Sequence, residues 1–269
     1  MSIIAGNTVI EAGEGTDRIR GLGLIVNVIV EELKKDWKET LRQVAEIGYD
    51  YLEFRGYYGD DIAYFKKFMQ EIGLKPLAAG DSIEQLKKED VLKRMIDESL
   101  YLGKKYLICY KLDAGAYKTA DDFKKAAADL NAIGEKVTHA GLCFAFHNHD
   151  KEFVPVQDHL SGYDLLVQET DSQRVALLLD IYWAIKGGAD PLILLQRYPE
   201  RFELFHVKDM DKTPEQLFTC PGNGIIDFPG IFAQAKKTNV QYYTVEVDKA
   251  SDPFQCIQDS YTYLKQLRF

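Results

Sequence analysis

The feature of this sequence that most limits its fold is a regular alternation of apolar, strand-like runs with amphipathic helical runs after residue 20. Parallel strands covered by helices on both faces are almost continuously apolar, as these runs are. Eight such runs are candidate strands: 22–28, 51–54, 74–79, 106–110, 142–146, 175–180, 202–207 and 242–247. Eight β/α units without a linker predict an α/β fold of one domain, a closed (β/α)8 barrel or TIM barrel. An open doubly wound sheet is the alternative, but its glycine-rich opening after the first strand is absent.

Helix boundary signals support this division of the chain. Gly48, Gly73 and Gly103 each follow a helical run, in the position where glycine ends helices. The segment 119–122 has the pattern of a capping box, and Asp-Pro pairs at 190–191 and 252–253 place an N-cap before a first-turn proline. We therefore expect a barrel over residues 21–269, preceded by a tail or flap over residues 1–20.

Composition restricts the possible partners. The formal charge of −9 gives no basic surface for nucleic acid or an anionic membrane, and the longest apolar run, 22–30, is too short to span a bilayer. We expect a small-molecule partner and allow a homo-oligomer. The four cysteines form no Cys-x-x-Cys pair, which predicts reduced thiols and a cytoplasmic protein, unless a trimmed signal peptide sent it to the periplasm.

Ligand-type side chains follow four consecutive predicted strands. The run 142–146 leads into His147, His149 and Glu152, and the next three strands end in Asp180, His206 and Glu246. An aspartate at one strand end is commonly a helix cap, but four such endings in a row favour a common site. The carboxyl ends of barrel strands meet at one mouth.

Mixed oxygen and nitrogen ligands suit Mn²⁺, Mg²⁺, Co²⁺ or Zn²⁺. At this level either Glu152 or His147 could complete a set with Asp180, His206 and Glu246. The sequence therefore predicts one divalent metal ion at the mouth.

Other residues are candidates for substrate contact. Lys208 could meet a substrate carbonyl or simply pair with a surface acid, and Arg55 and Lys111 suit an oxygen-rich substrate. Trp183 could stack on a sugar ring or pack on the rim of the barrel. The 222–224 Gly-Asn-Gly segment resembles a phosphate cradle only weakly and is more typical of a turn over the mouth.

In their order along the chain, these motifs resemble the sugar phosphate isomerase/epimerase family with a xylose isomerase-like barrel. The resemblance covers nearly everything after residue 21 and depends on Asp-Ile-Tyr-Trp at 180–183, His-Val-Lys-Asp at 206–209, Gly-Asn-Gly-Ile-Ile-Asp at 222–227 and Val-Glu at 245–246. It implies a metal-dependent enzyme that removes a proton beside a carbonyl of a sugar or cyclitol, with Asp180, His206 and Glu246 as ligands.

The chain departs from the family at strand five. Ketose epimerases of the family usually have Glu-Asn-His there, and this sequence has His147-Asn-His149. We expect Glu152 as the fourth ligand, which leaves His147, His149, Lys208 and Glu246 for proton transfer and charge stabilisation. This departure favours isomerisation or β-elimination, as in an inosose dehydratase or 3-keto-sugar lyase, over symmetric epimerisation. A metal-free carbohydrate-binding barrel is the alternative of another class.

Overall fold

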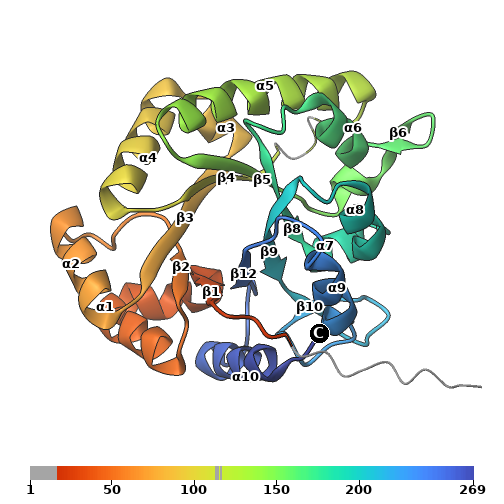
Figure 1. Cartoon of the computed structure of the whole chain (residues 1–269). Helices are drawn as coiled ribbons and strands as arrows, with labels where there is room; N and C mark the ends of the chain where they lie inside the picture. The colour runs from red at the N-terminus through yellow and green to blue at the C-terminus, as the bar shows by residue number, and fades with distance from the viewer. Residues whose placement is uncertain (1–16, 113–114, 116) are drawn as a thin grey trace, which may run out of the picture.

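The computed structural model describes residues 17–112, 115 and 117–269, so most of the expected tail lies outside the described residues. The described chain confirms the predicted fold: a closed barrel of eight parallel strands surrounded by helices (Figure 1). The barrel strands are β1 (Leu22–Ile25), β2 (Tyr51–Glu53), β3 (Lys75–Ser82), β4 (Tyr106–Lys111), β5 (Cys143–His147), β8 (Ala176–Asp180), β9 (Phe202–Val207) and β12 (Tyr242–Val245). Each pairs with its neighbours in sequence order, and β12 closes the ring on β1.

The helices follow the strands in the order expected for β/α units. They are α1 (Val30–Ile47), α2 (Ile62–Ile72), α3 (Ile83–Leu86), α4 (Glu89–Leu102), α5 (Ala120–His139), α6 (Gly162–Glu169), α7 (Ile181–Lys186), α8 (Pro191–Arg197), α9 (Phe228–Ala235) and α10 (Pro253–Gln266). The predicted capping box at Thr119 and Asp122 opens α5, and the Asp190 and Asp252 side chains cap α8 and α10. Among these described helices, none is long and apolar enough to cross a membrane.

Strand alternation divides the core into two parts. In β4, Tyr106 and Ile108 belong to a small apolar group inside the barrel, whereas Leu107 and Cys109 pack in the larger group between strands and helices. Successive strand residues point to opposite faces, so every second residue of each strand is directed to the barrel interior. This rule also determines which residues just past the strand ends face the mouth.

The first β/α unit differs from the expectation. Strand β1 ends at Ile25, and a 3-10 helix, η1 (Val26–Ile29), continues directly into α1. The segment 36–39, Asp-Trp-Lys-Glu, resembles a capping box and predicts a helix start at Asp36. In the structure Asp36 marks a kink within α1, where its backbone is extended at φ −154° and its side chain accepts a hydrogen bond from the Glu39 N–H at 3.1 Å. The helix therefore begins before its strongest sequence signal.

Two short hairpins that the sequence did not predict follow barrel strands. One is formed by β6 (Pro155–Gln157) and β7 (Leu160–Ser161), after a 3-10 turn, η2 (Lys151–Phe153); the other is formed by β10 (Asp209–Met210) and β11 (Phe218–Thr219). They follow the C-terminal ends of β5 and β9, which carry candidate site residues.

The prediction of reduced thiols is wrong for one pair. Cys220 and Cys256 form a disulfide with a Cα–Cα distance of 5.7 Å. They are 36 residues apart, and only the closed barrel brings the segment after β11 onto α10. Spacing along the chain therefore could not reveal the pair.

Candidate active site

The candidate site is formed by inward-facing residues at the C-terminal ends of four strands. His147, Asp180 and His206 each lie two residues beyond a residue of the barrel interior, respectively Ala145, Leu178 and Leu204. Glu246 stands in the same relation to Thr244, which pairs in register with His206. The inward rows of the strands thus change from apolar to ligand-type side chains at the mouth.

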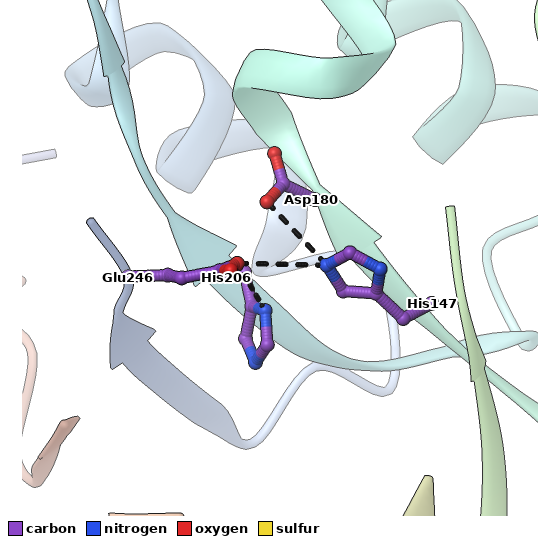
Figure 2. A group of neighbouring side chains, drawn as sticks. All are labelled: His147, Asp180, His206 and Glu246. Atoms are coloured by element: carbon purple, nitrogen blue, oxygen red, sulfur yellow. Dashed lines mark hydrogen bonds and ion pairs between the residues drawn. The ribbon is translucent and has the colours of Figure 1, made fainter. Parts of the chain in front are cut away.

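His147, Asp180, His206 and Glu246 form one compact group (Figure 2). One potential ligand atom from each lies within 4.8 Å of the others, and all four residues are buried. The Nε2 atom of His147 is 3.5 Å from both Asp180 Oδ2 and Glu246 Oε2, and His206 Nδ1 is 2.7 Å from Glu246 Oε2. Two imidazoles and two carboxylates therefore converge on one point.

The hydrogen bonding of this group is incomplete. Among the described residues, His147 Nε2 and Asp180 Oδ2 have no hydrogen-bond partner, although both are buried. Buried polar atoms are rarely left in this state, and the 3.5 Å separations are too long for good hydrogen bonds. A cation between these atoms would satisfy them, so the donor set fits a divalent metal with mixed nitrogen and oxygen ligands.

Electrostatics support the same interpretation. Burial opposes charge on the His206 imidazole, but the flanking carboxylates of Glu53 and Glu246 outweigh it and raise its pKa to about 10. Burial, helped by the nearby Glu246 charge, raises the pKa of Asp180 above its usual range. The carboxylates therefore favour positive charge next to them, which a bound cation would also supply.

Asp180 both caps a helix and belongs to the group of four. Its Oδ1 atom accepts a 2.8 Å hydrogen bond from the Trp183 N–H and caps α7, which leaves Oδ2 for the group of four. The Asn148 side chain bonds the backbone N–H and C=O of Asp180 at 3.0 and 3.1 Å. Asn148 therefore fixes the end of β5 against the end of β8.

Glu152, the expected fourth ligand, is not in this group. Its Oε2 atom accepts a 2.7 Å hydrogen bond from the backbone N–H of His149, within the turn that contains η2. The structure places His147 where the sequence analysis expected Glu152. The physical reason is strand alternation, because His147 continues the inward row of β5 whereas Glu152 lies in the turn after that strand.

Glu53 and Tyr110 are site residues that the sequence analysis missed. Glu53 ends β2, is 0% exposed, and places Oε2 at 3.1 Å from His206 Nε2. The Tyr110 hydroxyl donates to the same oxygen at 3.1 Å. Alternation in β2 could have indicated Glu53, since Tyr51, two residues earlier, packs on the barrel interior.

Lys208 directly follows β9 at the mouth of the barrel, and its side chain is buried and not exposed at the surface. It is 0% exposed, and its Nζ is 3.0 Å from Asp248, 3.3 Å from Glu246 and 3.7 Å from Asp180. These carboxylates outweigh the effect of burial and raise the pKa of the ammonium. Contact of Lys208 with a substrate oxygen stays a prediction, because the residue does not line the adjacent cavity.

A cavity of about 440 Å³ opens beside the group. His149, expected to transfer protons, lines it together with Arg55 and Lys111, whose contact with substrate stays a prediction, and Arg55 pairs with Asp81 at 3.1 Å. The Trp183 ring lies 5.3 Å from the His149 ring. Burial lowers the pKa of His149 to about 3, so its imidazole is neutral near pH 7. The lining also contains an apolar edge: Ile25, Val26, Val30, Phe54 and Tyr58.

The Gly-Asn-Gly turn is occupied by the protein itself. The buried Asp209 carboxylate accepts hydrogen bonds from the backbone N–H groups of Gly222 and Gly224, each at 3.0 Å, and from Ile226 at 3.1 Å. A Cβ atom on Gly224 would lie 2.3 Å from Asp209 Oδ1, so only glycine permits this approach. The turn is an anchor for the segment after β9 and not a phosphate cradle.

A closed (β/α)8 barrel with a buried histidine and carboxylate group at its strand ends defines the class: a barrel enzyme with a candidate metal site. The chain belongs to the xylose isomerase-like TIM barrel family, whose model matches residues 41–267. The resemblance found in the sequence is thereby confirmed.

Individual relatives agree with this assignment. An inosose dehydratase from Geobacillus kaustophilus is 24% identical over 266 residues, covering 86% of this chain and 84% of the relative. A sugar phosphate isomerase/epimerase structure from Parabacteroides distasonis is 25% identical with a TM-score of 0.79, and 96% of each chain is covered. The zinc-bound IOLI protein shares the fold, with a TM-score of 0.73 at 18% identity over 93% of this chain and 99% of IOLI.

Proposed function

We propose that this chain is a divalent-metal-dependent enzyme that removes a proton from the carbon beside a carbonyl group of a keto-sugar or cyclitol. The observation that carries the proposal is the convergence of His147, Asp180, His206 and Glu246 with buried, unsatisfied ligand atoms. We assign these four as the metal ligands, with His147 in place of Glu152. Zn²⁺ and Mn²⁺ are the ions that suit two imidazoles and two carboxylates best.

A bound divalent cation supplies electrophilic stabilisation of the negative charge that develops on a substrate oxygen. The chain supplies the proton transfer. His149 lines the cavity, and among the described residues its ring has no hydrogen-bond partner, so a ring nitrogen can accept the substrate proton. Arg55 and Lys111 orient the oxygen-rich substrate from the cavity wall.

Elimination of a β-substituent is the specific reaction that we favour. Ketose epimerases of the resembling family have a glutamate at the position of His147, and a carboxylate on each substrate face suits removal and return of the proton. Here the strand-five side offers His149, whose ring is 4.8 Å from that of the assigned ligand His147, and an imidazole that does not bind the metal can accept one proton and later protonate a leaving oxygen. The similarity to an inosose dehydratase supports this choice.

The decisive experiment has two stages. Purified protein is first analysed for metal and then incubated in heavy water with a panel of inososes and keto-sugars, where we expect metal-dependent deuterium exchange at the carbon beside the carbonyl. The His149→Ala variant should retain metal and lose exchange, whereas the control variant His159→Ala, in an exposed turn, should retain both.

Product analysis then separates the two reactions. Loss of a β-substituent supports elimination, and inversion at the exchanged carbon with the substituent retained supports epimerisation. A metal-free protein without exchange would favour a carbohydrate-binding barrel.

The disulfide bears on the location of the protein. Disulfides persist mainly in oxidising compartments, so the Cys220–Cys256 bond supports the periplasmic alternative over the cytoplasmic one. This can be tested by labelling free thiols with an alkylating reagent in cell fractions. We expect Cys220 and Cys256 to be protected from the reagent, and complete labelling of both would favour the cytoplasm instead.

A further inference from the structure

The His206 ring lies between two buried carboxylates. Its Nδ1 atom is 2.7 Å from Glu246 Oε2, on the side of the group of four, and its Nε2 atom is 3.1 Å from Glu53 Oε2. Glu53 is not a member of the group of four. The imidazole of His206 therefore lies between Glu246, which belongs to the group of four, and Glu53, which does not.

The position of Glu53 determines which His206 nitrogen is available. A neutral imidazole has one N–H donor and one lone pair, and an ionised carboxylate can only accept. With a cation at the group of four, His206 would be a neutral ligand, and its hydrogen bond to Glu53 would then place the remaining proton on Nε2 and direct the Nδ1 lone pair towards the cation. Without Glu53, either nitrogen could carry the proton.

Tyr110 supports this arrangement from the neighbouring strand. Its hydroxyl donates to Glu53 Oε2 at 3.1 Å, and its ring stacks on the His206 ring at an interplanar angle of 25°. Glu53 is 0% exposed, and burying a carboxylate is costly unless its partners compensate. Glu53 hydrogen-bonds the ligand histidine and the tyrosine that packs on that histidine, so these two bonds connect it to the metal centre.

We propose that Glu53 is a positioning residue that holds His206 with Nε2 protonated and Nδ1 presented to the metal, and that Tyr110 fixes the Glu53 carboxylate. This inference rests on the proposed function, because it requires a metal at the group of four. Partners of metal-bound histidines orient the ring and raise its basicity, and their loss typically reduces metal affinity about 10- to 100-fold.

The test compares metal affinity and the state of the His206 ring in matched variants. Zn²⁺ dissociation constants are measured by competition with a chromophoric chelator, and the Nε2–H proton is followed by NMR with ¹⁵N-labelled histidine. In Glu53→Leu we expect affinity to fall about 10- to 100-fold and the exchange-protected Nε2–H signal to disappear. Glu53→Gln, which keeps an acceptor, should show a smaller loss.

Glu203→Leu is the matched control. Glu203 also accepts a hydrogen bond from a tyrosine, Tyr106 at 2.6 Å, but lies near the opposite end of β9. Its substitution should leave the Zn²⁺ affinity unchanged.

The outcomes separate this proposal from the proposed function. Unchanged affinity in Glu53→Leu, with Zn²⁺ bound by the wild type, overturns the role of Glu53 alone, whereas absence of Zn²⁺ binding in the wild type overturns the proposed function. If Glu53→Leu does not fold, Glu53→Gln and Tyr110→Phe decide: weakened Zn²⁺ binding with an altered Nε2–H signal supports the proposal, and wild-type values for both variants refute it.

Discussion

The carboxylate of Glu152 accepts a 2.7 Å hydrogen bond from the backbone N–H of His149. The bond links two residues of the turn after β5 and holds the carboxylate away from the group of four. Glu152 is not among the residues whose ligand atoms converge there. His147, in contrast, already directs Nε2 to Asp180 and Glu246.

This relationship gives the first prediction. His147→Ala should lower affinity for Zn²⁺ by more than the roughly 10- to 100-fold typical of losing an outer partner of a ligand, because a direct ligand is lost. Glu152→Gln should bind Zn²⁺ like the wild type, since the amide oxygen can still accept from His149. Chelator competition on both variants measures this, and the reverse ranking would return the ligand role to Glu152.

The sequence predicted the order of the strands and the residues that follow them, because both depend on local patterns. It could not determine the direction of a side chain beyond a strand end. Asp180, His206 and Glu246 lie within one residue of the ends of their strands and meet as expected. The choice between His147 and Glu152 depended on the turn geometry after β5, and Glu53 was overlooked because β2 has only three residues.

Lys208 gives the second prediction. Removing one partner of a buried ion pair typically costs about 3–5 kcal/mol, so Lys208→Met should lower the free energy of unfolding by about 3 kcal/mol in metal-free protein. The loss should be smaller with saturating Zn²⁺, because the metal compensates Asp180 and Glu246. Urea unfolding with and without Zn²⁺ measures both values.

Lys93→Met is the control for this experiment. Lys93 pairs with Asp97 at 2.7 Å, but its side chain is 75% exposed, so little change is expected. Equal effects of the two substitutions would show that the buried carboxylates do not need Lys208.

The disulfide gives the third prediction. Closing a loop of 36 residues reduces the conformational entropy of the unfolded chain, and a native disulfide typically contributes about 2–4 kcal/mol. The double variant Cys220→Ser, Cys256→Ser should therefore unfold at lower urea concentration than the wild type. A reductant should destabilise the wild type and leave the double variant unchanged, and an effect on both would indicate a different target.

Lys104 gives the last prediction, which concerns pH. Its Nζ is buried, donates to the Phe54 carbonyl at 2.8 Å and lies 3.7 Å from the centroid of the Phe54 ring. Burial lowers its pKa to about 7, whereas a lysine in the unfolded chain titrates near 10.4. Between these values the unfolded chain binds more protons than the folded one, so the Lys104 contribution to stability rises with pH.

The expected rise from Lys104 between pH 7 and pH 9 is about 2 kcal/mol, because one proton corresponds to about 1.4 kcal/mol per pH unit. Lys104→Met should remove this rise. The free energy of unfolding of the wild type, relative to that of the variant, should therefore be larger at pH 9 than at pH 7. Lys105→Met, the adjacent residue, controls for general effects of losing a lysine. A pH-independent difference for Lys104→Met would mean that the Phe54 carbonyl and ring keep the buried ammonium charged throughout this range.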